Sequence, residues 1–458
     1  MALNLTKDLI SRFNVTGPRY TSYPTAPEWQ DDFPVSQYET ALAQFNSGSK
    51  TLSLYVHIPF CPTMCYYCGC NVVIRKPKQA VGDDYIAYLA KELELITYSL
   101  NRRPLVKQLH LGGGTPNSLS PTQLARLMQV IQTAVELDFS GEIAIEVDPR
   151  TVTHDHIVML KKLGFNRISM GIQDFDTTVQ KAINREQPFE QVAQLMDWIR
   201  DAGFTSVNMD LIYGLPHQTP ETVANTIRQV LELSPERIAL YSYAHVPWLK
   251  SHQNLIAETS LPDAETKLDL FLTAQTLFTQ NGYQAIGMDH FAKASDEMAI
   301  AYQENRLYRN FMGYTVKPAD EYIGIGVTSI GFLENTFIQN TRDLTTYYAT
   351  LDQGQLPISR GLALSPDDQQ RQWVIAQLMC HFRLIKAEFN TRFAADFDTL
   401  FATEQAHLAT CEQDGLLTQT PEGIHITDLG KLFIRNVCMG FDAYFQAAQT
   451  KRRFSKTV

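Results

Sequence analysis

Short apolar runs alternate with longer segments of helical period between residues 51 and about 290. Runs rich in β-branched and aromatic side chains predict strands, whereas apolar residues spaced three or four positions apart predict helices. The pattern predicts strands at residues 52–58, 106–112, 142–148, 167–172, 207–214 and 238–243. Ser120 and Thr219 each precede a proline at the start of a helical segment, as expected for an N-cap and a first helical position. Six β-then-α units predict an α/β fold built on a parallel sheet with right-handed crossovers.

The segments on either side of this pattern differ from it. The first 50 residues contain a turn-rich stretch in which Pro18, Pro24 and Pro27 exclude a long helix, which predicts an ordered arm. Beyond about residue 360 the runs become helical, which predicts a smaller, mostly helical domain. We therefore expect an N-terminal arm at 1–50, a catalytic βα domain at 51–360 and a helical C-terminal domain at 361–458.

Periodicity alone leaves two architectures open, an open doubly wound sheet and a whole or partial barrel. Both place ligand chemistry at the carboxyl edge of the parallel strands. Glycines and polar residues gather where the expected strands end, at Gly112–Gly114, Glu146, Asp148, Gln173, Asp210 and Tyr243–His245. We therefore expect one site at this edge of the sheet.

Composition and charge narrow the class of protein. Hydrophobic residues make up 44% of the 458 residues and charged residues 19%, which is typical of a folded globular chain. The 39 Lys and Arg against 49 Asp and Glu leave a net charge of −10, which repels phosphate backbones, so nucleic acid is not an expected partner. The N-terminal residues lack the apolar core of a secretory signal, and every apolar run is interrupted before it reaches the length of a membrane span. We expect a cytoplasmic protein without a membrane span.

Four of the seven cysteines fall within ten consecutive positions, at Cys61, Cys65, Cys68 and Cys70. In a reducing compartment, such clustering indicates metal or redox chemistry rather than disulfides. The first three, spaced C-x3-C-x2-C, can bind one face of an iron–sulfur cubane and leave one iron without a protein ligand, whereas ferredoxin motifs complete the coordination with protein sulfur. A structural zinc site is a competing hypothesis, although four cysteines in one short loop are cramped for tetrahedral coordination. Unliganded thiols are the third hypothesis.

A glycine triplet at residues 112–114 follows one of the expected strands. Without Cβ atoms, its backbone N–H groups can closely approach the carboxylate or amine of a ligand. A plain chain turn is the alternative for this feature taken by itself.

The cysteine spacing, Tyr67 directly before the third cysteine, and GGGTP at residues 112–116 resemble the radical S-adenosylmethionine (SAM) enzymes. Further features resemble the family of oxygen-independent coproporphyrinogen III oxidases: GPRYTSYPTA at 17–26, the fourth cysteine, EVDPR at 146–150, NMDLIYGLP at 208–216 and IRNVCMGFD at 434–442. This resemblance extends over nearly the whole chain. Heme chaperone proteins of the same superfamily are similar in the cluster and barrel regions, but they carry an aromatic residue at the position of Cys70 and lack the arm.

The resemblance implies a partial (βα)6 TIM-like barrel and a [4Fe–4S] cluster that is held by Cys61, Cys65 and Cys68 and binds SAM at its remaining iron. It also implies an oxidoreductase that uses a 5′-deoxyadenosyl radical. Two propionate side chains of coproporphyrinogen III would be oxidatively decarboxylated to vinyl groups, giving protoporphyrinogen IX in heme biosynthesis. The expected partners are the porphyrinogen substrate and an unidentified reductant, and we expect a monomer. The alternatives are a heme chaperone without decarboxylase activity, a zinc-stabilised interaction protein, and a radical enzyme with another substrate.

Matching the family's motifs position by position implies two bound SAM molecules. The first would contact Tyr55, Gly113, Glu146 and Ile330. The second would contact Tyr67, Gly114, Thr115, Gln173, Arg185, Asp210 and Ala244. The residue types suit these roles, because carboxylates accept hydrogen bonds from ribose hydroxyls or an amine, and an arginine clamps a carboxylate. Taken alone, Ile330 would be interpreted as core and Arg185 as a helix-end ion pair.

Tyr55, His57 and Cys70 are the catalytic candidates. His57 shares a strand face with Tyr55 and is expected to relay a proton or bind substrate, with a structural histidine as the alternative. As a fourth cluster ligand Cys70 would compete with SAM, so we expect it to face substrate or the second SAM, unless it is a small buried hydrophobe. Arg19 and Tyr20 in the arm are candidates for binding a propionate, because the substrate bears four carboxylates.

Overall fold

Seven parallel strands form the centre of the structure. In the computed structural model, which describes residues 7–45, 50–76, 78–316, 319, 321–447 and 454–457, they belong to a 13-stranded sheet. Their order across the sheet is β14 (Glu321–Ile325), β2 (Leu52–Ile58), β5 (Leu105–Gly113), β6 (Glu136–Val147), β7 (Arg167–Gln173), β8 (Ser206–Tyr213) and β9 (Arg237–Ser242). The six strands predicted from the sequence are confirmed, and only β6 begins well before its predicted position. β14 is an additional parallel strand that the sequence pattern did not reveal.

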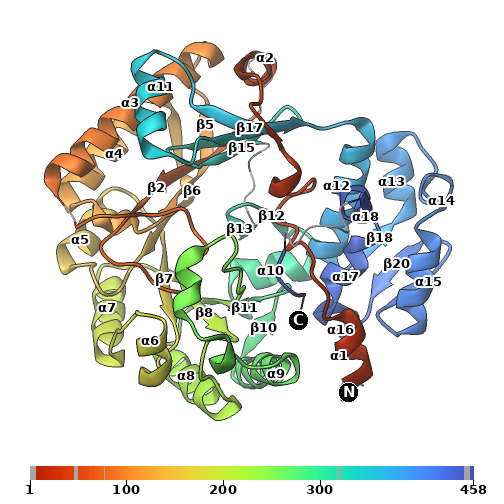
Figure 1. Cartoon of the computed structure of the whole chain (residues 1–458). Coiled ribbons are helices and arrows are strands. Elements are labelled where there is room, and N and C mark those ends of the chain that lie inside the picture. The colour runs from red at the N-terminus through yellow and green to blue at the C-terminus, as the bar shows by residue number, and fades with distance from the viewer. Residues whose placement is uncertain are drawn as a thin grey trace.

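Helices follow the strands in alternation and cover one face of the sheet (Figure 1). They are α3 (Gln79–Leu100), α4 (Pro121–Ala134), α5 (His154–Lys162), α7 (Phe189–Asp201), α8 (Pro220–Leu233) and α9 (Ala264–Gln280). Each packs against the next in an arc outside the strands, so that the sheet curves into an incomplete barrel. Ser120 and Thr219 cap α4 and α8 as predicted, each with a reciprocal capping box. The α/β fold with a partial barrel is therefore confirmed.

Antiparallel strands extend the sheet at both edges. On the β14 side they are β15 (Ile330–Leu333), β16 (Thr336–Asn340), β17 (Ile358–Ala363) and β1 (Gln30–Asp31). On the β9 side they are β11 (His290–Lys293) and β10 (Tyr283–Ala285). A separate hairpin of β12 (Tyr308–Asn310) and β13 (Gly313–Thr315) lies in the gap between the two ends of the curved sheet (Figure 1).

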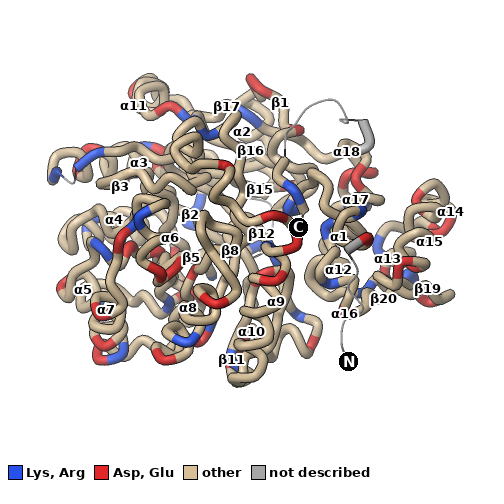
Figure 2. Tube along the Cα trace, turned by 60° about the horizontal axis from the view of Figure 1, so that its bottom comes forward, with Lys and Arg blue, Asp and Glu red and all other residues tan. Residues whose placement is uncertain are grey.

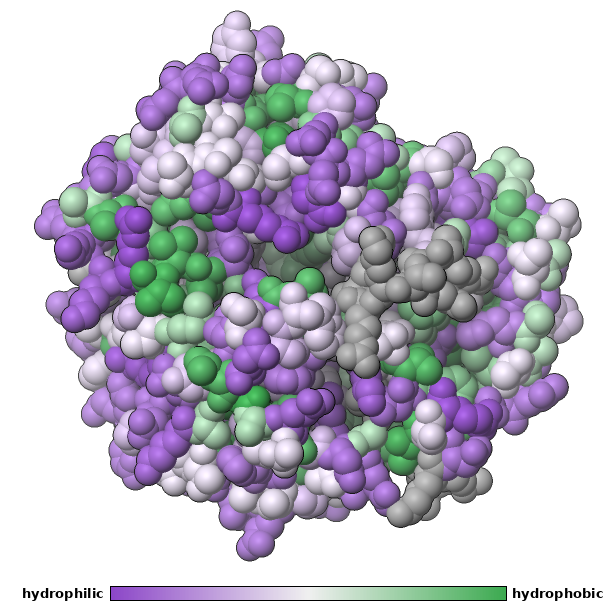
Figure 3. Space-filling model, in the orientation of Figure 1, coloured by the Kyte–Doolittle hydropathy of each residue, from purple (hydrophilic) through white to green (hydrophobic). Residues whose placement is uncertain are grey.

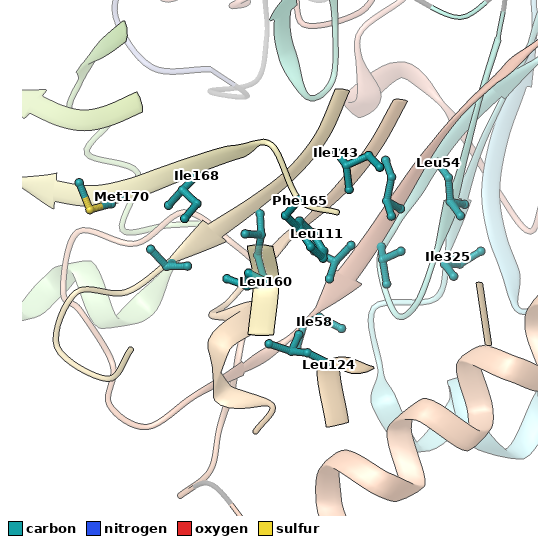
Figure 4. Close-up of a cluster of buried hydrophobic side chains, with 14 of the residues drawn as sticks. Leu54, Ile58, Leu111, Leu124, Ile143, Leu160, Phe165, Ile168, Met170 and Ile325 are labelled. Carbon is teal, nitrogen blue, oxygen red and sulfur yellow. The ribbon is translucent and has the colours of Figure 1, made fainter. Parts of the chain in front are cut away.

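Alternate residues of the parallel strands face the helices and form the main hydrophobic core. Figure 4 shows Leu54 and Ile58 of β2 and Leu111 of β5 in one buried cluster with Leu124 of α4 and Leu160 of α5. Full burial of such a side chain contributes about 1.5–3 kcal/mol. This packing fixes which residues of each strand face the opposite way, into the barrel.

The residues that face into the barrel are largely polar. The Ser53 hydroxyl donates to Gln108 at 2.8 Å, and the Gln108 amide donates to Glu142 at 2.9 Å, across β2, β5 and β6. Parallel strands buried on both faces usually consist of continuous apolar residues. The inner face of this sheet is therefore built to line a ligand site rather than a second hydrophobic core.

The C-terminal part is mostly helical, as predicted. It contains α12 (Pro366–His381), α13 (Lys386–Phe393), α15 (Gln405–Gln413), α17 (Ile434–Met439) and a small sheet of β18 (Arg383–Ile385), β20 (Gly423–Ile426) and β19 (Leu417–Gln419). None of the helices that the structure describes is both long and apolar enough to cross a membrane.

The N-terminal arm is fastened to the C-terminal part. Leu9, Tyr20 and Tyr23 belong to the hydrophobic core of that part, and Arg12 forms an ion pair with Asp414 at 2.8 Å. Residues 1–6 and 46–49 of the expected arm lie outside the described residues. The arm therefore leads from the C-terminal part, on which it packs, to β2, the first parallel strand of the barrel.

Glu92 of α3 is a buried carboxyl group that joins the outer helices to the antiparallel extension of the sheet. It accepts hydrogen bonds from the Gly326 amide at 2.8 Å, and from the side chains of Asn340 and Tyr347 at 2.5 Å each. Burial raises the pKa of Glu92 from an ordinary 4.5 to about 7. Between pH 4.5 and pH 7 the Glu92 carboxyl is therefore protonated in the folded chain but ionised in the unfolded chain.

The substitution Glu92→Gln should remove this titration. Because stability falls with rising pH wherever the folded state binds more protons, the wild-type chain should lose stability relative to Glu92→Gln between pH 4.5 and 7, by about 3 kcal/mol at most. Urea unfolding at several pH values measures this difference. Glu94→Gln, on the exposed side of the same helix, should follow the wild type at every pH. A pH-independent difference between Glu92→Gln and wild type would contradict the expectation.

Candidate active site

The four clustered cysteines lie in the loop that follows β2, at the carboxyl edge of the parallel strands. Two short parallel strands, β3 (Phe60–Cys61) and β4 (Val73–Ile74), close the base of this cysteine loop. The Gly114 amide donates to the carbonyl of Ile58, and the Val73 amide to that of Pro59, each at 2.8 Å. The cysteine loop is therefore tied both to its own strand and to the glycine triplet after β5.

The segment after β9, which includes the 3-10 helix η3 (Ser251–Leu255), holds the cysteine loop from another side. Three of its side chains bind carbonyl oxygens of the cysteine loop: Lys250 to Cys70 at 3.0 Å, His252 to Cys68 at 2.7 Å and Gln253 to Tyr67 at 3.0 Å. Gln253 also donates to the carbonyl of Ala244 at 3.2 Å. Ala244 is therefore linked to the cysteine loop through one shared side chain.

Gly114 leaves room for the first cysteine. A Cβ atom at this position would lie 2.5 Å from the Pro59 carbonyl oxygen and 3.0 Å from the Cys61 Sγ. The Thr115 hydroxyl, one residue further on, lies 3.4 Å from the same sulfur. The glycine triplet therefore has a role beyond a turn, since it lets the chain approach a cluster cysteine closely.

Asp148, Arg150 and Arg185 form a buried ion cluster beside the second cysteine. Asp148 pairs with Arg150 at 2.7 Å and with Arg185 at 3.3 Å. Burial alone would raise the pKa of Asp148, but the two arginines outweigh burial and lower it. The Arg150 Nη2 and the Arg185 Nη1 lie 3.6 Å and 3.7 Å from the Cys65 Sγ. Two guanidinium groups against one carboxylate leave surplus positive charge next to this thiol.

These residues fit a [4Fe–4S] cluster. A cluster with cysteine thiolate ligands is anionic, so it matches the surplus positive charge, and the glycine leaves space next to Cys61. The Arg185 Nε is a buried nitrogen without a hydrogen-bond partner, which points to a further polar ligand here. Within the described residues, no three His, Cys, Asp or Glu side chains stand close enough to hold a single metal ion, as structural zinc requires. In a [4Fe–4S] cluster each cysteine binds a different iron, so the cysteines stand further apart than the ligands of a single zinc ion.

A cavity of about 460 Å³ lies next to the cysteine loop on the inner face of the sheet. This reaction cavity opens in the hollow at the centre of the face that Figure 3 shows. Seven residues predicted for the site line it: Arg19, Tyr55, His57, Cys70, Gly113, Glu146 and Ile330. Of the strand-end residues expected to share one site, Gly113 and Glu146 line this cavity, whereas Asp148, Gln173, Asp210 and Tyr243–His245 do not.

Tyr55 and His57 form a hydrogen-bonded pair in the wall of the reaction cavity. The His57 Nε2 faces the carbonyl oxygen of Asn71 at 3.1 Å, so this nitrogen carries the proton and the Nδ1 accepts from the Tyr55 hydroxyl at 3.2 Å. Burial lowers the pKa of His57 to about 4, which leaves the ring neutral at physiological pH. The Tyr55 ring stacks on His110 with centroids 5.9 Å apart. The pair is therefore uncharged and held in one orientation.

Glu146 is oriented by two neighbours. Its Oε1 lies 3.1 Å from the His110 Nε2, and its Oε2 accepts from the Gly113 amide at 3.2 Å. Burial alone would lower the pKa of His110, but the hydrogen bond to Glu146 and the negative charges of Glu146, Glu142 and Asp210 together outweigh burial and raise it. Asp210 lies deeper in the barrel, where it accepts from Ser169 at 3.1 Å, and burial raises the pKa of Asp210 to about 6.

The residues expected around a second SAM fall into two groups. Tyr67, Gly114, Thr115, Gln173 and Arg185 surround the cysteine loop and the ion cluster. Asp210 instead binds Ser169 inside the barrel, and Ala244, after β9, is linked to the cysteine loop through Gln253.

Arg19 and Tyr20, which are neighbours in the arm, point into different parts of the structure. Arg19 reaches the reaction cavity, where its Nη2 binds Asp289 at 2.9 Å. Tyr20 turns toward the C-terminal part, where its hydroxyl donates to Asp442 at 3.0 Å. Tyr20 therefore does not line the reaction cavity, although its neighbour Arg19 does.

Sequence reasoning missed several polar residues of the site. His110 lies two positions before Gly112 on the same strand face, so the period of two could have revealed it. Arg150 stands in the EVDPR motif two positions from its partner Asp148, so the motif could have revealed it. Asp289 and Arg309 gave no such signal, because their places depend on how distant loops fold together.

The site defines a class of protein. A curved βα sheet with a three-cysteine loop after the first central strand and a glycine triplet after the next is the arrangement of radical SAM enzymes. Residues 55–230 match the family model of the Radical SAM superfamily, and residues 364–433 match that of the HemN C-terminal domain.

Relatives extend this match to the whole chain. The oxygen-independent coproporphyrinogen III oxidase of Synechocystis sp. is 44% identical over 98% of this chain and 97% of its own length, and that of Escherichia coli K12 is 42% identical over 98% of each. The solved structure described as "Coproporphyrinogen III oxidase (HemN) from Escherichia coli is a Radical SAM enzyme" matches with a TM-score of 0.89 at 42% identity, covering 93% of this chain and 97% of that one. The chain belongs to the family of oxygen-independent coproporphyrinogen III oxidases.

The substitution Gly114→Ala should prevent normal loading of the cluster. The new Cβ must displace either the Pro59 carbonyl or Cys61, so anaerobically reconstituted protein should lose most of its iron and acid-labile sulfide. Gly69→Ala is the matched control, because a Cβ at Gly69 meets no atom within 4 Å although it lies in the same loop. Equal iron content in Gly114→Ala and wild type would disprove this role of Gly114.

Proposed function

We propose that this chain converts coproporphyrinogen III to protoporphyrinogen IX without oxygen, in heme biosynthesis. Each of two propionate side chains loses a hydrogen atom from its β-carbon to the 5′-deoxyadenosyl radical, then releases CO2 and passes one electron to a separate electron acceptor, and becomes a vinyl group. One observation carries the proposal: the cysteine loop, the ion cluster and the reaction cavity adjoin in a chain that aligns from end to end with the oxidases. The chain is therefore an oxidoreductase, and a porphyrinogen is its substrate.

The cofactors are a [4Fe–4S] cluster and SAM. When bound, they supply a carbon-centred radical that removes the hydrogen atom from the propionate. Cys61, Cys65 and Cys68 hold the cluster. Arg150 and Arg185 direct N–H groups at the Cys65 sulfur and place positive charge beside the bound cluster.

The residues expected for the first SAM line one end of the reaction cavity. Glu146, fixed by Gly113 and His110, presents carboxylate oxygens to an amine or to ribose hydroxyls. Ile330 packs from the β14 side of the sheet, and Tyr55 contributes its ring. Both ring nitrogens of His57 are used, one by the Asn71 carbonyl and the other by the Tyr55 hydroxyl, so its role is to position Tyr55.

A second SAM would bind on the other side of the cysteine loop, against Tyr67, Gly114, Thr115, Gln173, Arg185, Asp210 and Ala244. The unpartnered Arg185 Nε supports this, because an arginine with a free donor binds a carboxylate strongly.

Cys70 is a candidate for contact with substrate. Its side chain lies in the reaction cavity, and a hydrogen bond between the Cys70 and Cys68 thiols raises the pKa of Cys70. Arg19 reaches the same cavity and is the candidate for binding a propionate. Because its hydroxyl is already bound to Asp442, we assign Tyr20 to holding the arm in place.

We further propose a cytoplasmic monomer that receives electrons from a separate reductant and has no nucleic-acid partner. The cysteine loop and the reaction cavity are built within one chain, which supports the monomer. The division into 1–50, 51–360 and 361–458 is also a proposal, supported by separate hydrophobic cores in the barrel and the C-terminal part.

The test is anaerobic reconstitution followed by incubation with reductant, SAM and coproporphyrinogen III, with chromatography for 5′-deoxyadenosine and for the porphyrin product. We expect one deoxyadenosine for each vinyl group. Cys65→Ala should abolish both products, whereas Cys411→Ala, at a buried position of the C-terminal part, should keep them. Cys70→Ser should keep its iron but form less vinyl product.

Other outcomes would contradict the proposal. Deoxyadenosine without a vinyl porphyrin would point to another substrate of the same chemistry. Tight heme binding with no CO2 release by cluster-loaded protein would point to the heme chaperone.

A further inference from the structure

A second large cavity adjoins the reaction cavity. This side cavity, of about 400 Å³, lies between the arm, the β12–β13 hairpin, the β14–β16 end of the sheet and the helices α12 and α13. Its wall shares Thr21, Arg309 and Tyr322 with the reaction cavity. The two cavities are therefore neighbours, separated by a few side chains of the arm and the sheet.

The reaction cavity is too small for everything it must hold. A cavity that encloses one drug-sized ligand is about 300–1,000 Å³. The reaction cavity has about 460 Å³, and the four residues expected for the first SAM form part of its wall. SAM therefore occupies part of this space, and the rest cannot enclose a tetrapyrrole with four propionates. The ring that reacts can enter, but the remainder of the substrate needs room elsewhere.

The walls of the side cavity suit pyrrole rings. Aromatic side chains from the sheet and from the C-terminal helices line it, namely Tyr322, Phe332, Phe337, Trp373 and Phe393. Aromatic rings pack well against flat, electron-rich rings in offset or edge-to-face arrangements.

Arg309 provides a cation at the junction of the two cavities. Its Nη1 donates to the carbonyls of Arg19 at 3.1 Å and Tyr20 at 3.2 Å, and its Nε is buried without a partner. The nearest carboxylate, Asp289, is already bound by Arg19 at 2.9 Å and by His290 at 2.7 Å. A buried charge that no carboxylate contacts is costly, so Arg309 favours an anionic ligand. Figure 2 shows both basic and acidic segments around β12 in the middle of the molecule.

Arg392 provides a second cation, where the side cavity meets a further pocket of about 340 Å³ that also contains Arg383. Its guanidinium lies 5.7 Å from the centre of the Phe393 ring, and no ion pair holds it within the described residues. The one carboxylate in the lining, Glu321, accepts from Lys50 at 2.9 Å and from the Glu334 amide. The side cavity is therefore positively charged on balance.

We propose that the side cavity is the second half of the substrate site. It holds the part of the tetrapyrrole that is turned away from the cysteine loop, and Arg309 and Arg392 bind the carboxylates of its propionates. This inference rests on the proposed function and names where the unreacting propionates bind. It also explains why the arm, the barrel and the C-terminal part must meet, since each contributes a wall.

Equilibrium binding tests the proposal independently of turnover. The full chain is titrated with coproporphyrin III, a stable tetracarboxylate, and with its uncharged tetramethyl ester, and binding is followed by porphyrin fluorescence. Arg392→Glu should weaken binding of the acid about tenfold or more, because it replaces an attraction with a repulsion, and should leave the ester unaffected. Arg383→Glu is the matched control, since it makes the same charge change outside the side cavity.

A second variant tests the space rather than the charge. Ala376→Phe on α12 narrows the side cavity and should weaken binding of both the acid and the ester. Ala376 does not line the reaction cavity, so the reconstituted variant should match the wild type in iron content and circular dichroism, which shows that the chain is folded.

The outcomes separate the two proposals. Wild-type affinity for coproporphyrin III in both Arg392→Glu and Ala376→Phe would overturn the side-cavity proposal, even if the wild type forms vinyl product. Absence of vinyl product from the wild type would instead overturn the proposed function, while weakened binding in the two variants would still support the side cavity as a site for tetrapyrrole carboxylates.

Discussion

The ion cluster beside Cys65 is the interaction on which the site depends. Asp148 pairs with both Arg150 and Arg185, and each arginine also contacts the cysteine sulfur. One carboxylate cannot neutralise two guanidinium groups, of which that of Arg185 is buried and that of Arg150 half-buried, and unneutralised buried charge is costly. An anionic iron–sulfur cluster supplies the missing negative charge. Cofactor binding and local folding therefore stabilise each other at this edge of the sheet.

Much of this arrangement follows from strand periodicity. The alternation of strands and helices predicted six parallel strands, and parallel strands end at one edge, so the cysteine loop, the glycine triplet and Glu146 were expected together. The contacts of Cys65 were not predictable, because Arg150 and Arg185 lie 85 and 120 positions away and reach it through loops. β14 was missed for a similar reason, since it is only five residues long and its partner β2 lies far away in sequence.

The arm shows how neighbouring residues can take different roles. Tyr20 has a φ of 49°, in the left-handed region, and at this turn the arm passes between the barrel and the C-terminal part. Arg19 consequently faces the reaction cavity while Tyr20 enters the C-terminal core, a separation that composition and periodicity do not reveal. The same turn places Thr21 in the wall between the two cavities. The arm therefore separates the reaction cavity from the side cavity and also joins the barrel to the C-terminal part.

The coordination of the cluster is tested most directly by electron paramagnetic resonance of the reduced, reconstituted chain, recorded without and with SAM. Coordination by Cys61, Cys65 and Cys68 leaves one iron open, which predicts a [4Fe–4S] signal whose g values change when SAM is added. Cys70→Ser should show the same change as the wild type. A signal that SAM leaves unchanged, or purified protein that contains zinc in place of iron, would contradict three-cysteine coordination with an open iron.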